Sequence, residues 1–198
     1  MSHYFTDNRH LEENRKELTF RFWSFTCRFI SDNGVFSKNA VDFGSRVLIE
    51  TIGNEGTLHE KALDLGCGYG TIGIVLKKKF PDTAFQLVDV NPRAVLLATE
   101  NAKLNHVDVA VKQSNIYETI NDHDFSEIIT NPPIRAGKEV IYAMFEGAYD
   151  HLRSGGTLWV VIRKQQGAAS AKTKIASIFG NCEIVTKNKG YQVLKAVK

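Results

Sequence analysis

The sequence contains few cysteines and places none of them in a CxxC spacing. Its three cysteines, Cys27, Cys67 and Cys182, are an odd number, so they do not make a complete disulfide framework. They also lack the paired spacing of a zinc site. Free thiols of this kind persist in a reducing compartment, so we expect a cytoplasmic protein.

Long apolar stretches and several catalytic motifs are also missing. No segment approaches the ~20 apolar residues that a membrane-spanning helix needs, and the first 18 residues are too polar for a signal peptide. There is no GxSxG nucleophile motif and no P-loop. We therefore expect no membrane partner. We also expect no metal, because the histidines are scattered without the spacing of metal ligands. They are His3, His10, His59, His106, His123 and His151.

What the sequence does contain is an ordinary globular composition. Its 198 residues are 43% hydrophobic and 24% charged, which suits one folded unit with a substantial core. We expect a single domain over residues 1–198, made of a β-rich N-terminal extension (1–35) and a catalytic core (36–198).

Positive charge is concentrated toward the C-terminus. Residues 131–198 contain 11 Lys and Arg against four Asp and Glu, whereas the whole chain has a net charge of +3. Such a segment can attract a polyanion such as RNA. A lysine-rich solvated surface would have the same composition, so both interpretations stay open here.

Hydrophobic patterning predicts an α/β fold. Short apolar segments typical of buried strands alternate with segments of helical spacing, which indicates a mostly parallel, doubly wound sheet. The last two strands are separated by three residues, too few for a crossover helix, so they predict an antiparallel hairpin at one edge. The expected strands are 17–31 (strand or hairpin), 61–65, 84–90, 109–114, 126–130, 157–162, 182–187 and 191–198, and the expected helices are 41–52, 71–80, 91–105, 139–152 and 170–179.

A glycine-rich loop, DLGCGYG (64–70), follows the strand at 61–65. Glycines there allow a tight turn and let a ligand approach the backbone closely. Asp89 ends the next strand, where a carboxylate can accept hydrogen bonds from both hydroxyls of a ribose. Asp64 would repel a pyrophosphate but attract a positively charged group. S-Adenosylmethionine has an ammonium group, a ribose and an adenine, so we expect it as the cofactor.

The octapeptide NPPIRAGK (131–138) follows the strand at 126–130. Two consecutive prolines cannot donate hydrogen bonds, so they end the strand in a rigid turn. The Asn131 side-chain oxygen and the Pro132 carbonyl offer two acceptors, which suit the two N–H bonds of an exocyclic amine. Gripping both bonds would aim the nitrogen lone pair at a methyl donor. The motif therefore predicts N-methylation through positioning and electrostatics.

Together, DLGCGYG, DVN (89–91) and NPPIRAG resemble class I S-adenosylmethionine-dependent methyltransferases of the Asn-Pro-Pro type. The blocks HYF (3–5), DNGVFSKNAVDFGS (32–45) and VVIRKQQGA (160–168) extend the resemblance to the methyltransferase small domain family. The resemblance implies the seven-stranded Rossmann-like methyltransferase sheet. It implies catalytic roles for Asn131, Pro132, Pro133 and Ile134, and cofactor binding by Asp64, Gly66, Cys67, Gly68, Gly70, Asp89, Val90, Asn91, Asn115, Ile116 and Asn131.

One position departs from the family pattern. Many Asn-Pro-Pro methyltransferases have an aromatic residue fourth in the motif, where it stacks on the target base, but this chain has Ile134. Stacking would then come from Phe36, Tyr4 or Phe5. The substrate-binding candidates are Phe36, Lys38, Arg135, Lys138, Arg163 and Lys164.

The best-known branch of this family methylates the 2-amino group of guanine in small-subunit ribosomal RNA. The resemblance thus implies ribosomal RNA or the small ribosomal subunit as partner, with a homo-oligomer left open. Three alternatives remain: methylation of a glutamine amide in a release factor, methylation of the adenine 6-amino group, and a non-catalytic RNA-binding module that keeps a cofactor-like pocket.

Overall fold

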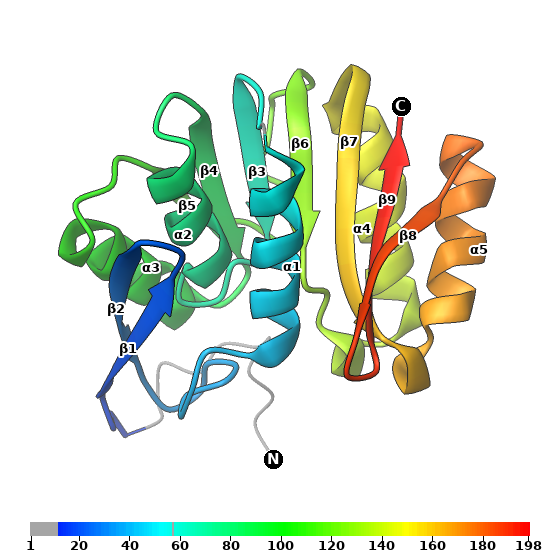
Figure 1. Cartoon of the computed structure of the whole chain (residues 1–198). Helices are drawn as coiled ribbons and strands as arrows, with labels where there is room; N and C mark the ends of the chain where they lie inside the picture. The colour runs from blue at the N-terminus through cyan, green and yellow to red at the C-terminus, as the bar shows by residue number, and fades with distance from the viewer. Residues whose placement is uncertain (1–11, 57) are drawn as a thin grey trace.

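A seven-stranded sheet with helices on both faces forms the body of the protein (Figure 1). The structure, a computed structural model, describes residues 12–56 and 58–198. The strand order is β5-β4-β3-β6-β7-β9-β8. Neighbours from β5 to β7 are parallel, whereas β9 runs antiparallel to β7 and β8. These strands are β3 (Lys61–Leu65), β4 (Ala84–Asp89), β5 (Ala110–Gln113), β6 (Phe125–Thr130), β7 (Leu152–Arg163), β8 (Glu183–Asn188) and β9 (Tyr191–Val197).

The helices cover the sheet in two layers. Three of them contribute to one apolar cluster on the first face, and two contribute to a separate cluster on the other face (Figure 1). The fold class, with its terminal hairpin, is therefore confirmed. Within the described ranges, no helix is long and apolar enough to cross a membrane. The first layer holds α1 (Phe43–Glu55), α2 (Thr71–Lys79) and α3 (Pro92–Leu104), and the second holds α4 (Lys138–His151) and α5 (Ala168–Phe179).

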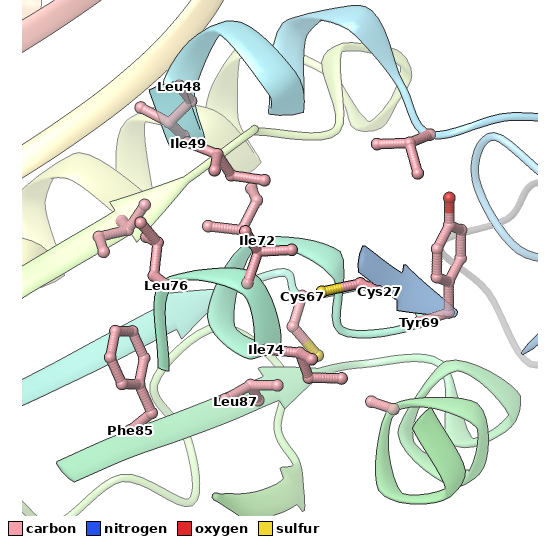
Figure 2. Packing of buried hydrophobic residues seen from close by; sticks show 14 of the residues in the cluster. Cys27, Leu48, Ile49, Cys67, Tyr69, Ile72, Ile74, Leu76, Phe85 and Leu87 are labelled. Atoms are coloured by element: carbon pink, nitrogen blue, oxygen red, sulfur yellow. The ribbon is translucent and has the colours of Figure 1, made fainter. Parts of the chain in front are cut away.

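The central strands are buried on both faces, as expected for a parallel sheet between two helical layers. All six residues of β6 are buried. Ile72 and Leu76 of α2 belong to the same cluster as Phe85 and Leu87 of β4, and Figure 2 shows these side chains lying between helix and sheet. This packing gives the loops at the carboxyl ends of the strands a rigid support.

The N-terminal extension is a two-stranded antiparallel hairpin, β1 (Lys16–Phe22) and β2 (Phe25–Ser31). Asn101 of α3 receives a hydrogen bond from the Ile30 N–H (2.7 Å) and donates one to the Ile30 carbonyl (2.9 Å). Asn105 makes the same pair of contacts with Arg28. The two amides thus satisfy the free edge of β2 as a neighbouring strand would. The hairpin predicted at 17–31 is confirmed.

Two details differ from the sequence-based expectation. Strand β7 begins at Leu152, directly after α4, rather than at residue 157. Gly155, with φ of 74°, lets the chain bulge within the extended segment without a steric cost. Short 3₁₀ turns, η1 (Ile134–Ala136) and η2 (Lys164–Gln166), follow β6 and β7; neither has a hydrophobic period that a sequence pattern could reveal.

Candidate active site

A cavity of about 230 Å³ lies at the carboxyl ends of β3, β4 and β6, where parallel α/β sheets bind their ligands. Its walls come from the glycine loop, the end of β4, the segment after β5, the turn after β6 and the 35–45 segment. Of the predicted site residues, the cavity is lined by Phe36, Gly66, Cys67, Gly68, Asp89, Val90, Asn115, Ile116, Asn131, Pro132 and Pro133.

The glycine loop forms a cradle with open space above it. The N–H groups of Gly66 and Cys67 both donate to the Val88 carbonyl at 2.9 Å, which fixes the loop against β4. Gly66 and Gly68 have φ of 76° and 56°, a region that disfavours other residues. A Cβ on Gly68 would meet nothing within 4 Å, and one on Gly66 only the Met144 Cε at 3.8 Å. The backbone is therefore open to close approach by a ligand.

Asp89 is held at the end of β4 by two backbone donors. Its Oδ2 accepts from the Gly68 N–H at 2.8 Å, and its Oδ1 accepts from the Asn91 N–H at 2.9 Å. Burial raises the pKa of Asp89, and the hydrogen bonds from Asn91 and Gly68 oppose that rise. Each carboxylate oxygen has a second lone pair, so both can still accept from a pair of vicinal hydroxyls.

Asp64 does not line the cavity, contrary to the expected direct contact with the cofactor. It is fully buried beneath the loop, because it lies one residue inside β3 and its Oδ2 accepts from the Gly73 N–H at 2.8 Å. Its Oδ1 has no hydrogen-bond partner. Burial, and secondarily the charge of Asp89, raise its pKa to about 7. The residue is a buried carboxyl that a nearby cation would stabilise as the anion.

Gly70 and Asn91 also lie outside the cavity lining, and their ligand contacts stay predictions. A Cβ on Gly70 would lie 2.8 Å from Ile74 Cδ1 and 3.2 Å from Ala98 Cβ, so glycine is needed there for helix packing. Asn91 caps α3 through the Arg93 N–H (3.0 Å) and donates to the Gly34 carbonyl (2.9 Å). Its side chain therefore serves the fold.

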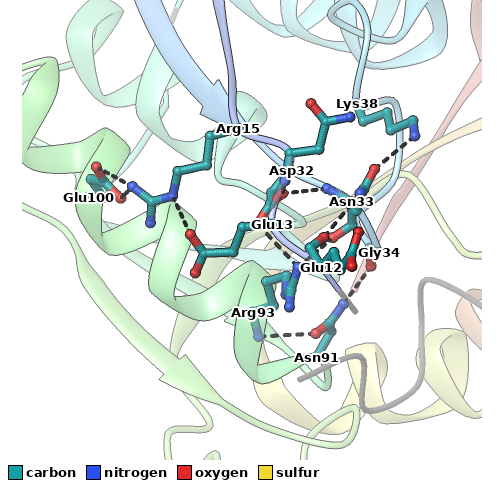
Figure 3. Close-up of polar contacts among 11 residues, drawn as sticks. Glu12, Glu13, Arg15, Asp32, Asn33, Gly34, Lys38, Asn91, Arg93 and Glu100 are labelled. Carbon is teal, nitrogen blue, oxygen red and sulfur yellow. Dashed lines mark hydrogen bonds and ion pairs between the residues drawn. The ribbon is translucent and has the colours of Figure 1, made fainter. Parts of the chain in front are cut away.

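The 32–38 segment is fastened over the start of α3 by polar contacts, which Figure 3 shows. Arg93 pairs with Asp32 at 3.2 Å, and both side chains are almost entirely buried. Lys38 donates to the Asn33 Oδ1 at 2.9 Å, so its ammonium group acts within this loop. The contacts place Phe36, 40% exposed, on the rim of the cavity. Tyr4 and Phe5, the other stacking candidates, lie outside the described residues.

Asn131 follows β6 and is gripped by two side chains that the sequence analysis did not select. Its Nδ2 donates to the Asp42 Oδ2 and to the Ser45 Oγ, both at 2.9 Å. A carboxylate can only accept, so the amide nitrogen must face Asp42 and the amide oxygen must face away from it. Among the described residues no donor reaches that oxygen. Asp42, Ser45 and Asn131 all line the cavity.

Asp42 and Ser45 take these positions because they begin α1. Asp42 is its N-cap, and its Oδ2 accepts from the Ser45 N–H at 2.9 Å. The block VDFGS (41–45) carries this Asp-x-x-Ser capping pattern, which could have suggested that the two side chains lie together. Asp42 and Ser45 are 89 and 86 residues away from Asn131 in the sequence, so the sequence did not predict that they contact it.

The residues that follow Asn131 do not all face the cavity. Pro132 and Pro133 line the cavity, but Ile134 does not. Ile134 begins η1 and packs against the apolar cluster of the second helical layer. Ile134 is only partly buried there, and its role beside the acceptor amine stays a prediction.

The predicted cations lie at the same edge of the sheet. Arg135 is exposed within η1 and Lys138 is exposed at the start of α4, while Arg163 and Lys164 are exposed where β7 ends. The Lys164 N–H donates to the Gly190 carbonyl at 2.7 Å, which ties the tip of the β8–β9 hairpin to this edge. In the chain from residue 12 onward, residue 57 apart, no group of three or more His, Cys, Asp or Glu could hold a metal ion.

Comparison with known proteins agrees with this geometry. Residues 26–195 match the family model described as methyltransferase small domain. The uncharacterised Bacillus subtilis (strain 168) protein YbxB is 43% identical over 198 residues, covering 99% of this chain and 98% of that protein. A Vibrio cholerae ribosomal RNA small subunit methyltransferase C is 32% identical over 173 residues, covering 83% of this chain and 48% of that protein. The chain spans about half the length of that relative.

Solved structures give the same result. A T. thermophilus 16S rRNA N2 methyltransferase (RsmC), in complex with AdoMet and guanosine, superposes with a TM-score of 0.84 at 25% identity, covering 93% of this chain and 50% of that chain. A methyltransferase from Pyrococcus furiosus shares the fold, with a TM-score of 0.65 at 22% identity over 75% of this chain and 81% of that chain. The chain therefore belongs to the methyltransferase small domain family, a family of S-adenosylmethionine-dependent methyltransferases, as its motifs predicted.

Proposed function

We propose that this protein transfers a methyl group from S-adenosylmethionine to the 2-amino group of guanine in small-subunit ribosomal RNA. The observation that carries the proposal is the fixed amide of Asn131, whose nitrogen is held by Asp42 and Ser45 while its oxygen is left for an amine. The similarity to ribosomal RNA methyltransferases, one of them an N2 methyltransferase with bound guanosine, supports the choice of base.

The residues present fit the cofactor. The open backbone of Gly66 and Gly68 would take the methionine portion, Asp89 the ribose hydroxyls, and Val90, Asn115 and Ile116 the adenine. The unpartnered, buried oxygen of Asp64 would favour the cationic portion through the field of its charge. When bound, the cofactor supplies an electrophilic methyl group on a sulfonium.

The chain's own residues position the acceptor amine. The Asn131 Oδ1 accepts one N–H of the amine and the Pro132 carbonyl accepts the other, because proline fixes that stretch of backbone. With both N–H bonds held, the nitrogen lone pair points toward the methyl donor. The rate enhancement comes from this orientation and from the fixed dipoles rather than from a strong base.

The ring that stacks on the target base is Phe36, because it is the exposed aromatic residue on the cavity rim. It replaces the aromatic residue that many relatives have at the position of Ile134. The 31–42 segment that carries Phe36 also holds Asp42 at its end, so base and amine would be positioned by one loop.

Transfer of labelled methyl groups tests the proposal. Purified small ribosomal subunits, deproteinised ribosomal RNA, transfer RNA and a release-factor domain would be offered as acceptors, with the Asn131→Ala variant as the blank. We expect label in ribosomal RNA, free or within the subunit. Label only in the release factor would instead establish glutamine methylation, which the same two acceptors could serve.

Asp42→Ala should lower kcat at least tenfold while leaving the affinity for S-adenosylmethionine within about threefold. The substitution removes the acceptor that orients Asn131, and it also removes the N-cap of α1, which costs about 1 kcal/mol of stability. Asp42→Ser separates the two effects, because serine caps a helix well but is too short to reach Asn131. Equal stability and a low kcat in Asp42→Ser would support orientation; wild-type kcat would rule it out.

Stability of the cofactor-free protein should fall as pH rises from about 4 to 7. Burial raises the pKa of Asp64 from 3.8 and that of Glu127 from 4.5, each to about 7. In this window the folded protein keeps protons that the unfolded chain has released, so the free energy of unfolding decreases with pH. Asp64→Asn and Glu127→Gln should each flatten the curve of unfolding midpoint against pH; Glu127→Gln can still accept the hydrogen bond from Trp159.

Affinity for S-adenosylmethionine should show the opposite trend. The cation of the cofactor favours the ionised form of Asp64, so binding releases a proton below pH 7 and affinity rises with pH, at most about tenfold per unit. Titration calorimetry in two buffers of different ionisation enthalpy measures the proton release. Asp64→Asn should abolish the release, whereas Glu127→Gln, outside the cavity lining, should preserve it. Release that persists in Asp64→Asn would assign the proton to another group.

A further inference from the structure

A cluster of rings and cations lies beside the cavity at the same edge of the sheet. We call it the ring–cation patch, and it consists of Phe43, Arg46, Arg163, Lys189 and Tyr191. Phe43 begins α1, Arg163 ends β7 and Tyr191 begins β9. Figure 1 shows the start of α1 and the tip of the β8–β9 hairpin at this carboxyl edge. Three segments distant in the sequence, namely the start of α1, the end of β7 and the β8–β9 turn with the start of β9, thus meet on one surface.

The rings and cations of the patch contact each other. The Phe43 and Tyr191 ring centroids are 5.7 Å apart at an interplanar angle of 55°. The Lys189 Nζ lies 5.3 Å from the Phe43 centroid, and the Arg163 Cζ lies 5.6 Å from the Tyr191 centroid. The Arg46 Cζ lies 6.0 Å from Phe43. The result is a partly exposed aromatic surface bordered by positive charge.

Gly44 shows that the Tyr191 ring is built into this position. A Cβ on Gly44 would lie 2.7 Å from the Tyr191 Cε1 and 3.0 Å from the Asp42 Oδ2. Only glycine therefore lets the ring lie on the first turn of α1. The same distances place the ring within reach of Asp42, the side chain that holds Asn131. The patch thus adjoins the side chains of Asp42, Ser45 and Asn131 that would position the acceptor amine.

Most of the positive charge of the patch has no acidic partner within the described residues. Among residues 12–56 and 58–198, no carboxylate forms an ion pair with Arg163, Lys164 or Lys189. Arg46 alone is paired, with Glu50 at 3.5 Å. Exposed cations at this density, interleaved with rings, complement a strand of phosphates and bases rather than an apolar partner.

We propose that the ring–cation patch binds the RNA strand next to the target nucleotide. A flanking base stacks on Phe43 and Tyr191, and Arg163 and Lys189 bind phosphates. The cations that now lie over the rings leave them for phosphates, because base stacking outweighs an exposed cation–π contact. This inference rests on the proposed function in that it takes RNA as the substrate class.

Fluorescence anisotropy with a fluorescein-labelled, mixed-sequence, single-stranded RNA of about 20 nucleotides tests the inference on the whole chain. Lys189→Glu should weaken RNA binding at least tenfold and reduce the salt slope by about one or more. Its matched control is Lys198→Glu, the same charge change at the opposite edge, where the Lys198 Nζ lies 4.8 Å from the Tyr149 ring. The control should change RNA affinity less than twofold.

Stacking is tested separately. Tyr191→Leu should weaken RNA binding about tenfold and Tyr191→Phe should restore it, with S-adenosylmethionine affinity and thermal unfolding near wild type in both. Equal losses in Lys189→Glu and Lys198→Glu, or wild-type affinity in Tyr191→Leu, would overturn the inference. Polyglutamate competing as well as RNA of equal charge would assign the patch to an acidic polypeptide and overturn it too.

The two proposals fail in different ways. If methyl transfer to RNA occurs but Lys189→Glu binds and methylates RNA like the wild type, only the patch is wrong. If the patch variants lose RNA binding but no guanine is methylated, only the choice of acceptor is wrong.

Discussion

Replacing Asn131 with alanine should lower kcat by about 100- to 1,000-fold, the range seen when one pre-organised hydrogen-bonding group is removed from an active site. The affinity for S-adenosylmethionine should change less than about threefold, because in the proposed mechanism the side chain acts on the acceptor amine. Single-turnover methyl transfer under saturating cofactor measures the first quantity, and calorimetry measures the second.

Asn131→Asp provides a sharper control at the same position. Aspartate keeps the side-chain shape of asparagine and an acceptor oxygen. Its second carboxylate oxygen would replace the Asn131 Nδ2, which now lies 2.9 Å from the Asp42 Oδ2, so two carboxylates would lie about 3 Å apart. Repulsion between the two charges should turn the side chain away. We expect low turnover and reduced stability, both recovered in part by Asp42→Asn in the double variant. Substantial turnover in Asn131→Ala would show that the Asn131 amide does not hold the acceptor amine.

Asp89→Ala should weaken binding of S-adenosylmethionine by about 10- to 100-fold, equivalent to about 1.4–2.7 kcal/mol. The substitution removes both proposed acceptors for the ribose hydroxyls. It also leaves the Gly68 and Asn91 N–H groups, which now donate to Asp89, without their acceptor. The loop should therefore lose its fixed shape as well as its ligand contact. Calorimetric titration at pH 8 gives the dissociation constant without the contribution of the proton linked to Asp64.

Asp82→Ala is the matched control for that variant. Asp82 is exposed in the turn between α2 and β4, at the edge of the sheet opposite the cavity. It removes the same charge without touching the loop. If both variants bind the cofactor equally well, Asp89 does not anchor the ribose.

The sequence predicted the parts of the site that depend on local chemistry. Asn131 is followed by two prolines that end a buried strand, and the glycine spacing after β3 allows only a tight turn. These signals require no knowledge of distant contacts. The strand order was not predictable in the same way, because β3 pairs with β6 through residues that are 65 positions apart in the sequence, such as Ala62 and Glu127.

The placements that the sequence did not reveal are those that depend on the tertiary structure. Ile134 was expected beside the substrate from the family resemblance; the structure places it in a 3₁₀ turn, partly buried against the second apolar cluster and outside the cavity lining. Asp64 was expected to touch the cofactor, but it lies beneath the loop and bonds to Gly73. Asp42 was not selected from the sequence, because a helix N-cap is a sufficient reason for an aspartate at that position. Only the fold shows that Asn131 donates to the same carboxylate oxygen.

The most direct test of the account is the chemical identity of the methylated product. Small-subunit ribosomal RNA incubated with the protein and labelled S-adenosylmethionine would be digested to nucleosides and resolved by mass spectrometry. We expect 2-methylguanosine as the labelled nucleoside, and we expect it to be absent with Asn131→Ala. Label on a ring nitrogen or on a ribose hydroxyl would contradict the proposed reaction, because neither group offers the two N–H bonds that the proposed roles of Asn131 and Pro132 require.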